Sequence, residues 1–341
     1  MNKSTGKWWK AALFLLGFIL ILYVVVFMPI PYMADRPGSA DEIKPMILMK
    51  EGDQQEKGTF MLTTVSRSYL NVAGWVFAKL DRNAVISSKP KRNEAEYDTQ
   101  QLLYMTSSQS NAMEAAYRKA KEPYTVEPQY IFVVGLSTNP APKGNFQTKD
   151  KIISIDGQVL KDRDALTALL SGKKPGDKIK IVLDRGGKKV TENAELITLT
   201  DASTGKTRAG LGLTIGEVRK VVSQDPGKQV EFASTDIGGP SAGLMFTLEI
   251  YNQLTSGDLS QGHRIAGTGT IAPDGTVGAI GGVQFKIVAA DRKKAEIFFV
   301  PEENYEDAKN KADQIGTSMK LVPVKTVDDA LSYLKQLKSA S

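Results

Sequence analysis

Ser241 is the residue of this 341-residue chain whose surroundings best suit chemistry. It lies in Asp236–Gly243, between a Gly-Gly-Pro run and the apolar, helix-like stretch Ala242–Leu254. A helix N-terminus presents unpaired N–H groups with partial positive charge, and glycines let backbone approach a ligand closely. A hydroxyl held there could attack a carbonyl while the N–H groups stabilise the oxyanion. The same pattern also suits a serine that only caps the helix.

Lys286 is the candidate base for that serine. The downstream sequence predicts a strand at Gly267–Ile271, an Asp-Gly turn and then a helix with a Gly-Gly start over Ile280–Ala290. Lys286 would share one face of this helix with residues 283 and 290. Pointing inward, its ammonium would be desolvated and could lose a proton near neutral pH. A lysine that extends to solvent is the alternative.

The histidine and cysteine content narrows the choice of base. The chain has no cysteine and one histidine, His263, in a polar turn that suggests an exposed loop. A Cys nucleophile is therefore impossible, and a Ser-His-Asp site would have to use His263. A Ser–Lys dyad is the common nucleophile–base pair left for Ser241.

Three sequence blocks resemble the proteolytic domain of Lon-type Ser–Lys peptidases, in order over about Gly210 to Leu337. They are Gly239–Gly243, Thr268-Gly269, and Gly281-Gly282 followed by Lys286. The resemblance implies that Ser241 is the nucleophile, that Lys286 is the base, and that Thr268 orients the lysine ammonium or the serine hydroxyl. It also implies an oxyanion loop with these residues: Gly239, Pro240 and Ala242.

Two positions depart from the family pattern. Gly238 stands where the family often has Asp, and Thr270 stands where it often has Glu. Neither position supplies the attacking or proton-accepting group, so the departures bear on rate and substrate preference.

Composition excludes several other classes of protein. The formal net charge of +6 is scattered, with no basic run typical of a nucleic-acid partner. Without cysteine there is no disulfide framework or Cys metal site, and we expect no metal and no cofactor. Gly205-Lys206-Thr207 resembles the end of a phosphate loop, but Thr200 stands where a glycine is required, so we expect no ATP use.

The N-terminus predicts a membrane anchor. Ala11–Ile30 is an almost uninterrupted apolar run without charge, long enough for the ~30 Å hydrocarbon layer. A cleaved signal peptide is the rival, but its apolar region is usually about 7–15 residues and ends in a small-x-small site. Lysines before the run, and charges of both signs after it, favour a cytoplasmic N-terminus with the remaining domains outside.

The middle of the chain resembles a bacterial PDZ domain. Strands are expected at Tyr130–Leu136, Asp150–Ile155 and Lys178–Asp184, with a short helix at Asp162–Ser171. PDZ domains take an extended chain end as an added strand at a sheet edge, beside a helix. The resemblance implies that the groove is formed by the following residues: Ile131, Phe132, Val133, Leu166 and Leu170.

The expected fold is α+β, with a transmembrane helix, a β-rich PDZ-like domain and a Lon-type α/β proteolytic domain. A strand is expected at Gly58–Val65, helices at Ser66–Leu80 and Glu94–Lys121, and a strand–helix alternation from Glu296 onward. The expected domains are a tail (1–10), a transmembrane helix (11–30), a linker (31–45), a strand/helix segment that packs on the protease (46–122), a PDZ domain (123–198) and a protease (199–341).

The sequence thus favours a membrane-anchored, ATP-independent serine endopeptidase. We expect it to degrade small, unfolded or tail-accessible membrane or envelope proteins, and the family allows a homo-oligomeric ring. A scaffold that holds partners through its PDZ domain, with a vestigial dyad, is the alternative.

Overall fold

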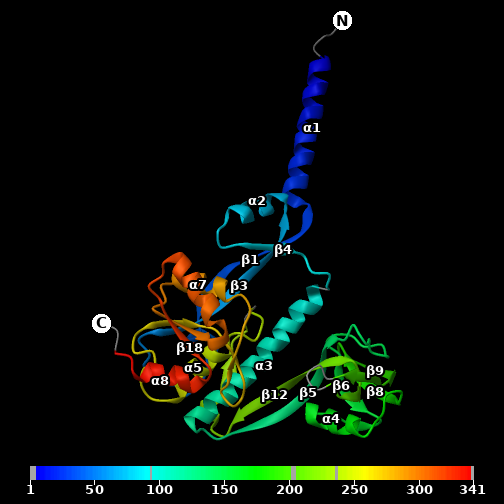
Figure 1. Ribbon diagram of the computed structural model, residues 1–341, viewed down its shortest axis with the longest axis vertical. Coiled ribbons are helices and arrows are strands. Elements are labelled where there is room, and N and C mark those ends of the chain that lie inside the picture. The colour runs from blue at the N-terminus through cyan, green and yellow to red at the C-terminus, as the bar shows by residue number, and fades with distance from the viewer. Residues whose placement is uncertain (1–4, 93, 201–204, 235–236, 339–341) are drawn as a thin grey trace.

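A computed structural model of the chain describes residues 5–92, 94–200, 205–234 and 237–338. Figure 1 shows an isolated N-terminal helix, a globular part that combines N-terminal strands with the C-terminal third, and a smaller β-rich part beside it. Asp236 and the first four residues of the expected tail lie outside the described residues.

The helices are spread over all three parts. They are α1 (Thr5–Phe27), α2 (Val72–Leu80), α3 (Glu94–Ala120), α4 (Arg163–Ser171), α5 (Gly243–Leu254), α6 (Val283–Arg292), α7 (Tyr305–Ile315) and α8 (Val327–Lys335), with 3-10 turns η1 (Lys44–Met46), η2 (Pro226–Lys228) and η3 (Glu302–Asn304).

The strands within the described ranges form two larger sheets and three short pairs. They are β1 (Pro29–Glu42), β2 (Ile47–Leu48), β3 (Thr59–Asn71), β4 (Val85–Ser88), β5 (Tyr124–Leu136), β6 (Lys151–Ile155), β7 (Gln158–Val159), β8 (Lys178–Arg185), β9 (Lys188–Glu195), β10 (Ile197–Thr200), β11 (Thr207–Gly210), β12 (Leu213–Ser223), β13 (Glu231–Phe232), β14 (Arg264–Gly267), β15 (Thr270–Ile271), β16 (Val277–Gly278), β17 (Ile297–Pro301) and β18 (Lys320–Val324).

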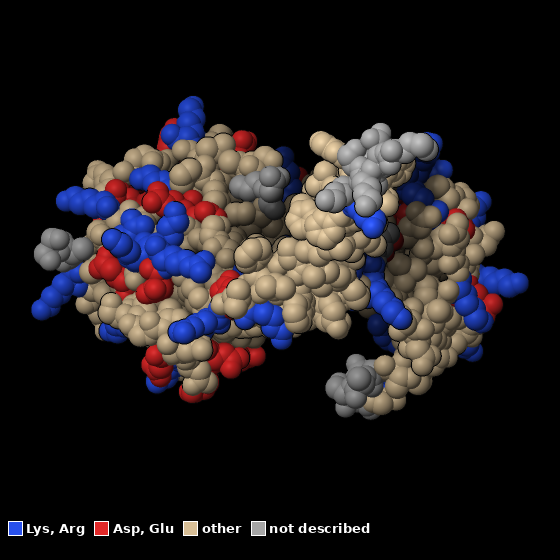
Figure 2. Space-filling view, turned by 90° about the horizontal axis from the view of Figure 1, so that it is seen from above, with Lys and Arg blue, Asp and Glu red and all other residues tan. Residues whose placement is uncertain are grey.

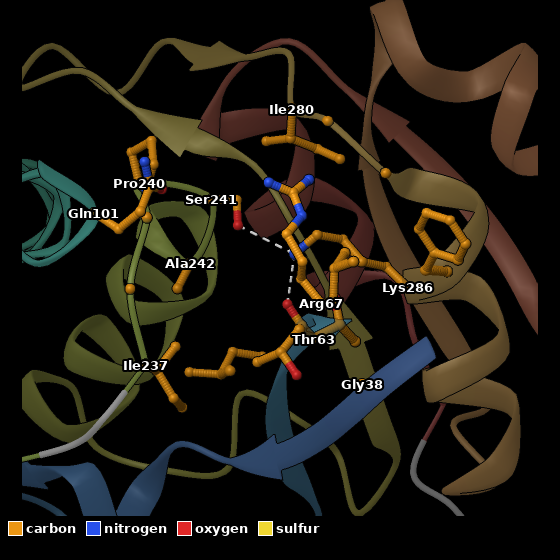
Figure 3. A pocket seen from close by; sticks show the side chains of 18 of the residues that line it. Gly38, Thr63, Arg67, Gln101, Ile237, Pro240, Ser241, Ala242, Ile280 and Lys286 are labelled. Atoms are coloured by element: carbon orange, nitrogen blue, oxygen red, sulfur yellow. Dashed lines mark hydrogen bonds between the residues drawn. The ribbon is translucent and has the colours of Figure 1, made fainter. Parts of the chain in front are cut away.

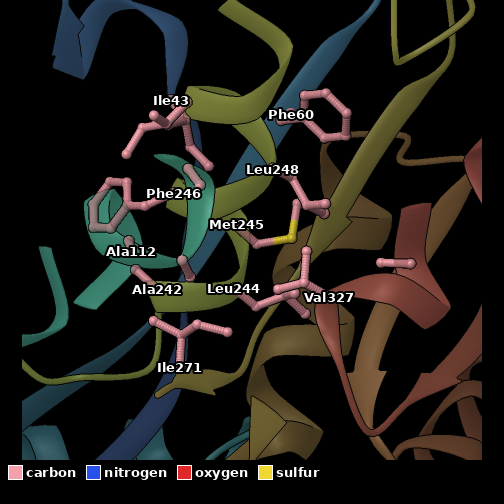
Figure 4. Close-up of a cluster of buried hydrophobic side chains, with 14 of the residues drawn as sticks. Ile43, Phe60, Ala112, Ala242, Leu244, Met245, Phe246, Leu248, Ile271 and Val327 are labelled. Atoms are coloured by element: carbon pink, nitrogen blue, oxygen red, sulfur yellow. The ribbon is translucent and has the colours of Figure 1, made fainter. Parts of the chain in front are cut away.

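The main sheet has the order β18-β17-β14-β3-β1-β4 and lies between two layers of helices. β3, β14, β17 and β18 are parallel, and β1 runs antiparallel to β3 and β4. Successive strand residues point to opposite faces. Phe60 and Leu62 accordingly join the core formed with α3, α5 and α8 (Figure 4), whereas Met61 joins the core formed with α6 and α7.

Two expectations for the N-terminal third are wrong. The expected linker 31–45 is mostly strand, because β1 runs to Glu42 and pairs with β3 along much of its length. The helix expected at Ser66–Leu80 begins only at Val72, since residues 66–71 extend β3. The cross-strand pair Asp35–Arg67, with Oδ1 and Nε 2.7 Å apart, fixes this register. A partner strand distant in sequence therefore overrode the local helical spacing.

The second sheet builds the smaller β-rich part, with the order β12-β5-β6-β8-β9 and β7 beside β6. Its core includes Ile131, Val133, Ile181 and Leu183, together with Leu166 of α4. β12 pairs with β5 along its whole length, so this part takes a strand from beyond residue 198. The expected boundary between 198 and 199 is therefore too early.

α3 lies along both α5 and β12. Its buried face carries small side chains, among them Ala112, Ala115 and Ala116, and polar ones, among them Ser108 and Glu114. Because small side chains allow close approach, this polar-looking helix packs directly on the globular part rather than acting as a spacer. The helices and strands expected after Glu296 are present as β17, α7, β18 and α8.

Candidate active site

Ser241 lies in the loop before α5, and it is not the helix cap. The N-cap position belongs to Ala242, which makes no side-chain capping hydrogen bond. The Ser241 hydroxyl oxygen instead accepts a hydrogen bond from Lys286 Nζ at 3.1 Å (Figure 3). This contact joins two residues 45 positions apart in sequence.

Lys286 projects from α6 into the interior and is only 3% exposed. Val283 and Ala290, on the same helical face, are buried as the spacing predicts. Its ammonium donates to the Thr63 carbonyl oxygen at 2.5 Å as well as to Ser241 Oγ. Burial away from water disfavours the charged form and lowers the pKa of Lys286 from 10.5 to about 8. A substantial neutral fraction therefore exists at mildly alkaline pH.

Thr63 was not among the residues predicted from sequence. It lies in β3, is buried, and its hydroxyl donates to the Gly267 carbonyl at 3.1 Å while its own carbonyl receives Lys286. β3 and β14 are adjacent parallel strands, which brings Thr63 beside the start of the Thr268 block. The apolar run Gly58–Val65 indicated a buried strand, but a backbone acceptor 223 positions from its donor leaves no local sequence pattern.

Thr268 holds the backbone of Ser241 instead of its hydroxyl. The Thr268 hydroxyl donates to the Ser241 carbonyl at 3.0 Å, and the same carbonyl accepts from the Gly269 N–H at 2.8 Å. Thr268 is fully buried, and no hydrogen bond described for it reaches the ammonium of Lys286. In this structure the expected contact of Thr268 with the ammonium or the hydroxyl is therefore replaced by a contact with the Ser241 main chain.

The loop residues expected to receive an oxyanion differ in what they offer. The Gly239 N–H already donates to the Gln101 carbonyl of α3 at 2.8 Å, and Pro240 has no N–H. The Pro240 carbonyl accepts from Ser108 Oγ at 2.9 Å, so α3 holds this loop at two points. Of the three predicted residues, Ala242 is the one whose N–H can serve as a donor, since no partner is described for it among the placed residues.

Gly238 fits the space that α3 leaves. A Cβ atom at this position would lie 2.8 Å from Gln101 Cβ. The aspartate common in the family would therefore collide with α3 unless the helix moved. Thr270, the other departure, lines the same cavity as Ser241.

His263 takes no part in this site. Its Nδ1 lies 2.6 Å from Glu296 Oε2, and its Nε2 lies 2.9 Å from the Lys338 carbonyl. These two partners raise the pKa of His263. His263 is also absent from the residues that line the cavity around Ser241.

The cavity that contains Ser241 and Lys286 has a volume of about 1420 Å³. One wall comes from α3, including Tyr97, and another comes from β1 and β3, including Arg67. The guanidinium of Arg67 is held by Asp35 of β1, to which it donates two hydrogen bonds of 2.7 and 2.9 Å. This space is larger than a typical small-molecule pocket and suits a stretch of polypeptide.

The strand predicted to form the peptide-binding groove of the β-rich part is not at the edge of its sheet. It is the neighbour of the edge strand. Residues 131–133 lie in β5, which pairs with β12 on one side and β6 on the other, and Ile131 and Val133 are fully buried core. The sheet edge belongs to β12, whose Leu213 and Ile215 pack on the same core as Leu166 and Leu170 of α4.

The signal that could have located this edge is Gly210-Leu211-Gly212 followed by the alternation Leu213-Thr214-Ile215. Gly212 has φ +69° and turns the chain into β12. Pairing with a strand some 80 positions earlier is not visible in local periodicity, so sequence reasoning assigned the edge to β5.

Comparison with protein families identifies both parts. Residues 231–336 match the sequence model described as the Lon protease (S16) C-terminal proteolytic domain. Residues 116–196 match the sequence model of the PDZ domain. The chain therefore combines a Lon-type proteolytic domain with a PDZ domain.

Curated relatives are similar to between a quarter and two fifths of this chain. A Lon protease of Elusimicrobium minutum is 30% identical over 153 residues, which cover 39% of this chain and 18% of that protein. A Lon protease of Fusobacterium nucleatum is 38% identical over 96 residues, or 28% of this chain and 12% of that protein. The chain thus spans less than a fifth of the length of these relatives.

Solved structures are similar to about a quarter of this chain. The PDZ domain of the SdrC-like protein from Listeria innocua is 25% identical, with a TM-score of 0.23, and the match covers 26% of this chain and 93% of that one.

Proposed function

We propose that this chain is a serine endopeptidase that cleaves peptide bonds with a Ser241–Lys286 dyad. The observation that carries the proposal is the buried Lys286 ammonium, 3.1 Å from Ser241 Oγ inside a cavity large enough for polypeptide. A hydroxyl is activated when a base lies within hydrogen-bond reach of it and a third group orients that base. Here the third group is the Thr63 carbonyl.

Each step of the proposed reaction uses atoms placed by the fold. Neutral Lys286 accepts the Ser241 proton as Oγ bonds to the substrate carbonyl carbon, and the Thr63 carbonyl stabilises the ammonium that forms. The Ala242 N–H stabilises the oxyanion, and Lys286 gives its proton to the leaving amine as the C–N bond breaks. Water then attacks the acyl group, Lys286 accepts its proton, and the proton returns to Ser241.

The N-terminal helix supplies the proposed location. Trp8–Phe27 is long and apolar enough to cross a membrane, and its side chains are not buried against the described protein. We propose that it is a retained anchor with the N-terminus in the cytoplasm and both domains outside, because lysines precede it.

The PDZ domain supplies the proposed selection of substrates. β12 is the last strand of its sheet, and its start near Leu213 and Ile215, beside α4, is the proposed site for an added strand. The N–H groups of the turn at Leu211 and Gly212 are the proposed donors to a terminal carboxylate. The proposed substrates are small, unfolded or tail-accessible membrane and envelope proteins, cleaved without ATP.

Purified full-length protein in detergent micelles tests this proposal. A fluorescently labelled, denatured protein is supplied without ATP, and cleavage is followed for the wild type, Ser241→Ala and Lys286→Met. Each variant is expected to lose about 1,000-fold or more of the rate. Equal cleavage by wild type and Ser241→Ala would overturn the proposal. Specific binding of carboxyl-terminal peptides with no cleavage by the wild type would favour the scaffold alternative.

A further inference from the structure

α2 presents an apolar face that nothing in the described structure covers. Its inner side chains, Trp75 and Ala78, pack on Ala34 and Leu70. The opposite face is 48% exposed at Val76, 69% at Phe77 and 76% at Leu80, with Val72 beside them. A helix on a water-exposed surface normally turns polar side chains outward, and this one does the reverse.

This face lies at the end of the candidate membrane span. α1 ends at Phe27, and the side-chain amide of Asn71, the N-cap of α2, donates to the Val26 carbonyl in the last turn of α1. Figure 1 shows α2 directly beside this end of α1. A bilayer that accommodates α1 would therefore have its interface at the level of α2.

The surroundings of α2 have the composition of a membrane interface. Tyr32 and Tyr69 are exposed on the neighbouring strands, and Lys79 and Lys89 lie over the rings of Trp75 and Tyr69. Exposed aromatic rings with lysines beside them are typical of the region where headgroups meet acyl chains. Seen along α1 (Figure 2), the middle of the molecule is mostly uncharged, and the charged side chains gather toward the outer parts of the view.

We propose that α2 lies in the membrane interface and inserts Val76, Phe77 and Leu80 among the lipids, as a second membrane contact beside α1. This inference rests on the proposed anchor. A second copy of the chain is a poorer occupant, because a nine-residue helix offers far less than the roughly 800 Å² per partner of a stable interface.

With both α1 and α2 in contact with the membrane, the distance of the active site from the bilayer would be fixed. β3 runs from Asn71, beside α2, to Thr63, which contacts Lys286. Eight strand residues at about 3.3 Å each place the dyad within about 26 Å of the interface. Membrane-protein segments that emerge from the bilayer would then come within reach of Ser241.

Site-directed spin labelling tests the proposal on the full chain, since the absence of native cysteine allows single labels. Nitroxides are attached to Val76→Cys, Phe77→Cys and Leu80→Cys in vesicles of phosphatidylcholine and phosphatidylglycerol. Collision rates with oxygen and with a water-soluble nickel chelate report lipid and water respectively. Lys309→Cys in α7 is the water control, and Leu20→Cys in α1 is the bilayer control.

The expected result is that oxygen collisions exceed nickel collisions at positions 76, 77 and 80, as at 20, with the reverse ratio at 309. A water-like ratio at all three α2 positions, with a lipid-like ratio at 20, would overturn the proposal and leave the anchor intact. A water-like ratio at 20 as well would overturn both. Dipolar broadening between labels at position 77 would assign the face to a second copy and refute the lipid assignment.

Discussion

Replacing Lys286 with methionine should change how the stability of the protein depends on pH. Lys286 has an ordinary pKa of 10.5 in the unfolded chain and about 8 in the folded one. Between these values the unfolded state binds more protons than the folded state, so the free energy of unfolding rises with pH. Lys286→Met removes this rise.

The size of the effect follows from the two pKa values. Below pH 8 the buried ammonium lowers the free energy of unfolding by about 3 kcal/mol, because each pKa unit between 10.5 and about 8 corresponds to about 1.36 kcal/mol. Integrated from pH 7 to pH 10, the wild type should gain about 2.5 kcal/mol relative to Lys286→Met. At a single pH, Lys286→Met has two opposing effects on stability. It removes the cost of the buried ammonium, and it leaves the Thr63 carbonyl without its donor, which costs about 1–3 kcal/mol. The change with pH isolates the titration.

Urea unfolding of the full chain in micelles measures this difference. Trp75 packs on β1 and β3 of the main sheet and reports on it when Trp8 and Trp9 are replaced by phenylalanine. Lys309→Met is the matched control, because its ammonium is exposed beside Asp313. If the difference between wild type and Lys286→Met stays constant from pH 7 to pH 10, Lys286 is not desolvated and the reasoning fails.

Three further predictions concern Thr268 and Gly238 at the active site and the buried Glu249 of α5. Thr268→Val should lower the turnover number about tenfold or more with little change in KM, because Ser241 loses one of two donors to its carbonyl; an unchanged turnover number would refute this role. Gly238→Asp should lower the melting temperature, and the added change Gln101→Gly should restore part of it, since Gln101 Cβ occupies the space that the new side chain needs. Burial raises the pKa of Glu249 from 4.5 to about 8, so the free energy of unfolding should fall as the pH rises from about 4.5 to 8. Over that range the stability of Glu249→Gln, measured by urea titration, should rise by up to about 4 kcal/mol relative to wild type. A difference that does not change with pH would contradict this prediction.

The sequence was sufficient to predict the features that local patterns encode. The inward-facing interpretation of Lys286 comes from Val283 and Ala290, which lie one turn before it and one turn after it on the same helix and are buried. The C-terminal strands and helices follow in the same way from contiguous apolar runs, such as the one that forms β17.

What the sequence could not reveal depends on contacts between distant segments. Residues 66–71 have helical spacing yet form strand, because β1 supplies a hydrogen-bonding partner. The acceptor at Thr63 is a backbone carbonyl, which every residue type has, so the residue type gives no sign of this role. The hydrogen bonds of Gln101 and Ser108 in α3 with the active-site loop likewise join segments more than 130 positions apart.

The most direct test of the Ser241–Lys286 dyad is the single-turnover cleavage rate of the full chain as a function of pH. With the pKa of Lys286 at about 8, about a tenth of the molecules carry neutral lysine at pH 7. The rate should therefore rise about tenfold from pH 6 to pH 7 and level off above pH 8, with Ser241→Ala inactive throughout. A rate that is constant from pH 6 to pH 9, or cleavage that persists in Ser241→Ala, would contradict the dyad.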